Sequence, residues 1–144
     1  MRIRIVFPTP FIFSTIISVR IGDINYGGHV GNDSILSILH EARLRFLHQW
    51  KYTEMNAGGC GLIMADSAIQ YKGEAFHGDN LHVEIGIANI SSLSFDIFYK
   101  IVTQRNDVTT NIVHAKTGMI CFDYKERRIM QMTEELREKL SISA

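Results

Sequence analysis

Cysteine is scarce in this sequence, and its placement excludes two classes of small protein. The 144 residues contain two cysteines, Cys60 and Cys121, and neither belongs to a Cys-x-x-Cys pair. Such a pattern supports neither a disulfide framework nor a zinc-binding knot. It is typical of a protein that works in a reducing compartment, so we expect a cytoplasmic location.

An excess of one charge is also absent. The 15 lysines and arginines balance the 15 aspartates and glutamates and are scattered along the chain. A nucleic-acid-binding protein normally carries a clustered positive patch, so we expect no nucleic acid partner. His77 and His82 flank a turn without a nearby cysteine or pair of carboxylates, and we therefore expect no metal site.

Long uninterrupted apolar segments are missing as well. The most apolar stretch covers residues 5–19 and follows two arginines, which is the order found in a secretory signal. Pro8 and Pro10 interrupt this stretch, however, and no small-residue cleavage site follows it. No other stretch is long and apolar enough to span a bilayer, so we expect no membrane contact.

What the sequence does contain fits one globular domain covering residues 1–144. A chain of this length with 46% hydrophobic side chains can bury a substantial core. Apolar residues recur at helical spacing over residues 33–51. The expected strands are residues 13–21, 62–71, 81–90, 93–102 and 111–124, and a short helix capped by Thr133 ends near Leu140. This order predicts an α+β protein in which a long central helix packs on an antiparallel sheet.

A polar, glycine-rich segment precedes the predicted long helix. Residues 22–33 read Gly-Asp-Ile-Asn-Tyr-Gly-Gly-His-Val-Gly-Asn-Asp and place acid, amide and imidazole groups where the helix begins. The first backbone N–H groups of a helix lack internal partners and lie at the positive end of its dipole. We therefore expect an anion or oxyanion site here, with Asn32 or Asp33 as the N-cap residue.

Three groups of residues, in this order and spacing, carry a resemblance to a known family. They are Asp23-Ile24-Asn25, Gly28-His29-Val30 and Asn32 with His40-Glu41-Ala42-Arg43; then Ile69-Gln70-Tyr71-Lys72 with Gly78-Asp79; and finally Thr133-Glu134-Glu135-Leu136-Arg137. With these residues the sequence resembles acyl-CoA thioesterases of the 4-hydroxybenzoyl-CoA thioesterase-like superfamily over nearly everything after about Ser14. The resemblance implies the hotdog fold, in which a long central helix is wrapped by an antiparallel sheet of five to six strands.

The resemblance also implies a reaction and an assembly. It implies hydrolysis of an acyl-CoA thioester at the interface of a homodimer or of a dimer of dimers, with CoA as part of the substrate and no separate cofactor. Family members commonly use a carboxylate two residues after the first Asp of the loop as general base or nucleophile. In this sequence that position holds Asn25, a neutral amide that cannot activate water as a carboxylate does.

Three interpretations of Asn25 are open. Asp23 lies two residues earlier and, in an extended segment, points the same way, so its carboxylate takes over. Alternatively, Glu41 or His29 supplies the base while Asn25 orients water or the thioester. In the third interpretation catalysis is lost and the site only binds an acyl thioester. We expect a working enzyme whose catalytic residues are Asp23, Asn25, His29 and Glu41.

Structural roles compete with these chemical ones. Asp23 is also suited to closing its loop through a bond to nearby backbone, and Glu41 is suited to an ion pair with Arg45 four residues later.

We expect the thioester carbonyl at the N–H groups around Asn32 and Asp33. The expected substrate-binding residues are Tyr26, Gly28, Val30, Asn32 and Asp33.

Two other functions share these features. The segment from Gly22 to Asn25, together with His29, is similar to the Gly-Asp-x-Asn-Pro-x-His loop of (R)-specific enoyl-CoA hydratases. In this sequence, however, Tyr26 replaces the proline and His29 lies one residue too far along. The other function is a non-catalytic module that binds acyl-CoA or an acyl carrier, which Asn25 favours. We rank hydrolysis first because the rest of the chain is more similar to the thioesterases.

Overall fold

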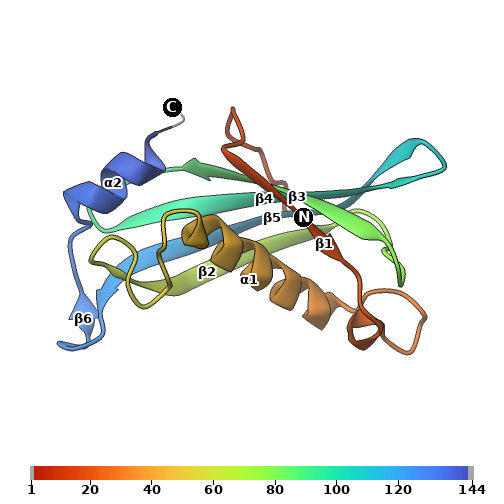
Figure 1. Ribbon diagram of the computed structural model, residues 1–144, viewed down its shortest axis with the longest axis horizontal. Coiled ribbons are helices and arrows are strands. Elements are labelled where there is room, and N and C mark those ends of the chain that lie inside the picture. Colours follow the sequence, from red (N-terminus) through yellow and green to blue (C-terminus); the bar gives the residue numbers. More distant parts are fainter. Residues whose placement is uncertain (1, 143–144) are drawn as a thin grey trace.

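The computed structural model describes residues 2–142, which form one sheet with a long and a short α-helix (Figure 1). The strands are β1 (Phe13–Ser18), β2 (Gly61–Tyr71), β3 (Asn80–Ala88), β4 (Ser94–Arg105), β5 (Val108–Asp123) and β6 (Arg128–Ile129). The helices are the 3₁₀ turn η1 (Ile21–Asp23), α1 (Asn32–His48) and α2 (Glu134–Leu140).

All strands of the sheet pair antiparallel, in the order β1-β3-β4-β5-β2, with β6 added beside β5. Figure 1 shows α1 lying along one face of this sheet. The predicted α+β architecture, a long central helix packed on an antiparallel sheet of five to six strands, is confirmed. This is the arrangement of the hotdog fold.

The element boundaries differ from the predicted ones where the chain turns. The strand expected over residues 13–21 ends at Ser18, because the following residues turn into η1. The helix expected over residues 33–51 ends at His48, and Lys51 takes a left-handed backbone conformation (φ 59°). β4 and β5 are longer than predicted, since both continue to a tight hairpin turn at Asn106 and Asp107 with φ angles of 51° and 64°.

The core lies between α1 and the sheet. The predicted stripe of α1 is buried, and it includes Ile35, Ile38, Leu39, Ala42 and Phe46. The alternating residues of β4 that are fully buried are Phe95, Ile97, Tyr99 and Ile101. The predicted helical periodicity is therefore confirmed, and β4 shows the alternation of a strand with one buried face. Within residues 2–142, neither helix combines the length and apolar character needed to cross a membrane.

One charged side chain is buried between α1 and the sheet. Arg43 is only 4% exposed, and its Nη1 donates a hydrogen bond to the Tyr99 hydroxyl (3.1 Å) while its Nε donates to Glu54 Oε2 (3.0 Å). The Tyr99 hydroxyl also bonds to Thr117 Oγ1 (2.7 Å). Burial opposes the guanidinium charge, but Tyr99 and Glu54 more than offset it, so the pKa of Arg43 lies above its usual value. A charged network thus joins the middle of α1 to β4 and β5.

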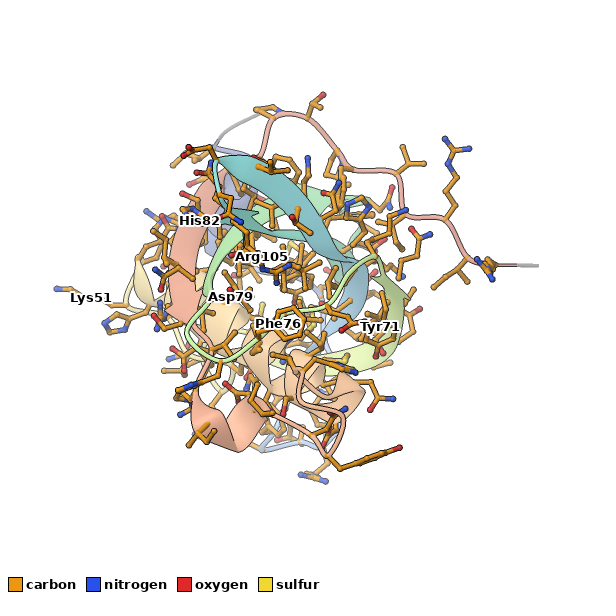
Figure 2. All side chains as sticks on the ribbon, turned by 90° about the vertical axis from the view of Figure 1, so that its right-hand side faces the viewer. Lys51, Tyr71, Phe76, Asp79, His82 and Arg105 are labelled. Carbon is orange, nitrogen blue, oxygen red and sulfur yellow. The ribbon has the colours of Figure 1, made fainter. Side chains whose placement is uncertain are left out.

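Arg105, the last residue of β4, holds the loop between β2 and β3 (residues 72–79). Its Nη2 donates hydrogen bonds to Asp79 Oδ2 (2.6 Å) and to the carbonyl oxygen of Glu74. Its guanidinium lies 4.9 Å from the centre of the Phe76 ring, and Figure 2 shows Phe76, Asp79 and Arg105 gathered at one end of the molecule. Burial alone would raise the pKa of Asp79, but the hydrogen bonds from Arg105 and from the Phe76 backbone hold it below its usual value. The loop is therefore anchored to the sheet by a charged pair.

We predict that Tyr99→Phe destabilises the fold by about 1–3 kcal/mol, because the change removes a buried partner of both Arg43 and Thr117. Urea unfolding followed by the fluorescence of Trp50, the one tryptophan of the chain, measures the free energy of unfolding. Tyr26→Phe is the matched control, since the Tyr26 side chain is fully exposed. A Tyr99→Phe protein as stable as the control would contradict a stabilising role for the network.

Candidate functional site

The loop between η1 and α1 closes on itself. Ile24 and Val30 form an antiparallel bridge, and the Asn25 N–H donates to the His29 carbonyl (2.9 Å). The Gly28 N–H donates to the Asn25 carbonyl (3.1 Å), and Gly28 has a φ of 83°, a conformation that favours glycine. Asn25 and His29 therefore stand opposite each other at the base of a tight turn.

The side chains of Asn25 and His29 have defined orientations. Asn25 Oδ1 accepts a hydrogen bond from the Gly27 N–H (2.9 Å), so its Nδ2 group remains a donor for a ligand. His29 Nδ1 lies 3.1 Å from the Val30 carbonyl oxygen. Because a carbonyl oxygen only accepts, Nδ1 carries the hydrogen and Nε2 of the neutral ring is an acceptor. The loop thus offers one hydrogen-bond donor and one acceptor side by side.

Gly27 lies between these two side chains. A Cβ atom added at Gly27 would lie 3.2 Å from Asn25 Oδ1 and 3.3 Å from His29 Nε2. Both distances are tight, so a methyl group would push the amide or the imidazole aside by a few tenths of an ångström. The position therefore favours glycine for space, although its backbone does not have a positive φ.

The start of α1 has no side-chain cap, and the prediction that Asn32 or Asp33 is the N-cap residue was wrong. The N-cap residue is Gly31, whose extended backbone (φ −71°, ψ 153°) brings its carbonyl to the Ile35 N–H (3.2 Å). The loop closes one residue earlier than predicted because the Gly31 N–H donates to the Asp23 carbonyl (3.1 Å). Within residues 2–142, no side chain accepts from the first N–H groups of α1. These groups are therefore available to an oxyanion.

A hollow of about 600 Å³ opens in front of this helix start. Its lining comes from the loop, from α1, from the end of β2 with the loop after it, and from β5. The lining residues are Asn25, Tyr26, His29, Val30, Asn32, Ile35, Tyr71, Lys72, Gly73, Glu74, Ala75, Ile112 and Val113. Of the expected site residues, the structure brings together Asn25, Tyr26, His29, Val30 and Asn32. Gly28 belongs to the same turn, and Asp33 follows Asn32 in the first turn of α1 without lining the hollow.

Asp23 and Glu41 line a different hollow, of about 350 Å³, between β1 and α1. The Asp23 carboxylate is almost fully buried and accepts a hydrogen bond from the Arg20 N–H (2.9 Å). Glu41 pairs with Arg45 (2.8 Å), one turn later on α1. Asp23 and Asn25 do not point the same way as expected, because η1 replaces the extended segment on which that expectation depends. The two acids are therefore separated from His29.

Three polar residues of the hollow were not predicted as site residues. Tyr71 ends β2, and Lys72 and Glu74 lie in the loop that follows. The Tyr71 hydroxyl lies 3.5 Å from the Asn32 carbonyl oxygen. The segment containing Tyr71 and Lys72 was part of the resemblance. Nothing in its spacing indicated that it folds against a loop more than 40 residues earlier.

The cysteines lie outside this hollow. Both are buried, and neither forms a disulfide bond. Cys60 Sγ accepts a hydrogen bond from the Thr133 N–H (3.3 Å), and burial raises the pKa of Cys121 to about 12. Neither offers a thiolate nucleophile to the loop. In the part of the chain that the structure describes, no three His, Cys, Asp or Glu side chains are grouped so that they could hold a metal ion.

Comparison with known proteins gives a consistent result. The thioesterase-like superfamily matches residues 19–140, while no curated protein matches the sequence. Among solved structures, a 1,4-dihydroxy-2-naphthoyl-CoA thioesterase from Synechocystis is 21% identical, with a TM-score of 0.77 over 89% of this chain and 94% of that chain. A thioesterase superfamily protein from Jannaschia is 18% identical, with a TM-score of 0.81 over 94% of this chain and 85% of that chain. The "YbaW Probable Thioesterase" from Escherichia coli is 26% identical, with a TM-score of 0.73 over 88% of this chain and 95% of that chain.

These similarities agree with the resemblance found in the sequence. The solved structures share the fold described above, in which α1 packs on the antiparallel sheet. The family match begins just after β1 and extends to the end of α2, so it includes the loop, the start of α1 and the end of β2 that together line the hollow. The chain therefore belongs to the thioesterase-like superfamily.

Proposed function

We propose that the protein hydrolyses acyl-CoA thioesters in the hollow at the start of α1. One observation carries this proposal. The Asn25 amide, the His29 imidazole and the uncapped N-terminus of α1 face one hollow in a member of the thioesterase-like superfamily. Together they provide hydrogen-bond donors for a carbonyl oxygen and an acceptor for water, which are the requirements of acyl transfer to water.

The proposed reaction assigns a role to each group. The thioester carbonyl oxygen lies at the N–H groups of Asn32 and Asp33, where the helix dipole stabilises the negative charge that develops during attack. His29 Nε2 accepts a hydrogen bond from the attacking water, and Asn25 Nδ2 donates to the water or to the carbonyl. Asp23 is a positioning residue, because its carbonyl accepts the Gly31 N–H and its carboxylate holds the turn before the loop.

The lining of the hollow supports an apolar acyl group. Ile35, Ile112 and Val113 form an apolar wall, and the Tyr26 and Tyr71 rings are exposed near its mouth. The Synechocystis protein of similar fold is a thioesterase for an aromatic CoA thioester, so aromatic thioesters belong among the substrates to be tested. We place the reaction in the cytoplasm and, as in other thioester hydrolyses, require no cofactor besides the CoA of the substrate.

We further propose that the active form is a homodimer joined along β2. This strand of 11 residues ends the sheet, so one of its edges has no partner strand within residues 2–142. Ile63 and Met64 near its start are about 40% exposed, and an exposed strand edge is a template on which another chain can pair. Its other end, at Tyr71, reaches the hollow, so a second copy would lie beside the site. Two dimers pairing into a tetramer is the larger assembly consistent with the family resemblance.

The proposed function predicts thiol release from CoA thioesters. Purified protein is incubated with saturated, aromatic and enoyl-CoA thioesters while free thiol and the enoyl absorbance are followed together. We expect thiol release that depends on the acyl group. Loss of enoyl absorbance without release of thiol would instead indicate a hydratase. No change in either signal would indicate a binding module.

Gly27→Ala tests the geometry of the loop. The added methyl group displaces Asn25 or His29, so we expect kcat to fall about 10- to 100-fold without loss of stability. Gly22→Ala is the matched control, because nothing lies within 4 Å of a Cβ at that position. Equal activity of both variants would contradict a catalytic role for the Asn25 and His29 pair.

Met64→Lys tests the assembly. We expect the wild-type protein to sediment at twice the 16.4 kDa mass of the chain or at a multiple of it, and the variant at the chain mass, because each copy would bring a charged lysine to the paired edge. Ile129→Lys, on the exposed strand β6, is the control. A wild-type protein that is monomeric and fully active would contradict the dimer.

A further inference from the structure

The hollow that holds Asn25 and His29 lacks the acids expected from the sequence. Asp23 and Glu41 line the other hollow, and the carboxylate of Glu41 is already paired with Arg45. Among the residues that line the hollow at the start of α1, Glu74 is the one with a carboxylate. The sequence gives no sign that Glu74 belongs to the site, because it lies 45 residues after His29 in the loop between β2 and β3.

The backbone holds Glu74 beside His29. The carbonyl of Ala75, the next residue, accepts a hydrogen bond from the N–H of Val30 (2.8 Å), the residue that follows His29. The carbonyl of Glu74 itself accepts from Arg105 Nη2. Two anchors therefore fix this part of the loop, one to the loop that carries His29 and one to the sheet. Figure 2 shows Arg105, which makes the second anchor, with Asp79 and Phe76 beside it.

The carboxylate of Glu74 has no partner of its own in the described chain. Within residues 2–142 it takes part in no hydrogen bond and no ion pair, whereas Glu41 pairs with Arg45 and Glu54 with Arg43. The anchoring of Glu74 is entirely through its backbone. The residue is exposed, so its carboxylate is free to move on an anchored backbone. An unpaired carboxylate that lines a hollow together with an amide and an imidazole is suited to proton transfer.

We infer that Glu74 is the catalytic carboxylate of this site, an inference that rests on the proposed hydrolysis. The water oxygen attacks the thioester carbon and one of its protons passes to Glu74, while His29 Nε2 holds the water by its other hydrogen. The resulting oxyanion is stabilised by the first N–H groups of α1. When the C–S bond breaks, Glu74 returns the proton to the sulfur. The products are the carboxylic acid and the CoA thiol, and Glu74 is again ionised.

Glu74→Gln tests this assignment on the thioester that the wild-type protein hydrolyses fastest. We expect kcat to fall about 10²- to 10⁴-fold with KM little changed, because the amide cannot accept the proton. Glu74→Asp should recover part of the activity, and added formate should recover part of the activity of Glu74→Ala.

Glu126→Gln is the matched control, since this glutamate is exposed in the turn between β5 and β6, and we expect it to leave kcat unchanged. Urea unfolding of each variant separates loss of chemistry from loss of fold. A Glu74→Gln protein with kcat within about threefold of wild type would overturn the assignment alone. If the wild-type protein releases thiol from none of the thioesters, both the assignment of Glu74 and the proposed function are overturned.

Discussion

The placement of α1 on the sheet is the constraint on which the site depends, and a buried guanidinium joins the two by directional hydrogen bonds. Apolar contacts such as those of Ile38 and Phe46 attract the helix to the sheet but tolerate sliding, because they are not directional. The hydrogen bond from Arg43 to the Tyr99 hydroxyl is directional, and an unsatisfied charge at that depth would be costly. The network therefore sets where along β4 the helix lies. This position of the helix brings the start of α1 to the end of β2 and to the loop after it.

The site itself is built from features that reduce local stability. Gly31 caps α1 without a side chain, although an Asn, Asp or Ser cap would stabilise the helix by about a few tenths of a kcal/mol. Gly27 adds conformational freedom to the unfolded chain, yet any side chain would displace Asn25 or His29. The compensating interactions are the Val30 to Ala75 hydrogen bond and the charged pair of Arg105 with Asp79. The first N–H groups of α1 therefore stay free, while these two interactions hold the loops around the site.

Periodicity in the sequence was sufficient to predict the fold but not the grouping of the polar residues. The stripe of α1, the alternation along β4 and the Thr133 cap, which accepts the Leu136 N–H, are local patterns, and the structure confirms them. The prediction that Asp23 points to the same side as Asn25 was wrong. The 3₁₀ turn η1 includes Asp23, so the segment is not the extended strand on which that prediction depended. Glu74 could not be found in the sequence, because it comes to the same hollow as His29 only through the Val30 to Ala75 hydrogen bond between two loops that lie far apart in the chain. Which polar side chains share a hollow is a tertiary property.

A crystal structure with a non-hydrolysable acyl-CoA analogue, in which a methylene group replaces the thioester sulfur, tests the central claim most directly. The account predicts that the analogue's carbonyl oxygen lies about 3 Å from the N–H of Asn32 or Asp33, with Asn25 and His29 on either side of the carbon and the acyl group against Ile35. An acyl group in the hollow between β1 and α1, beside Asp23 and Glu41, would contradict the account. It would transfer the chemistry to the two acids that the fold separates from His29.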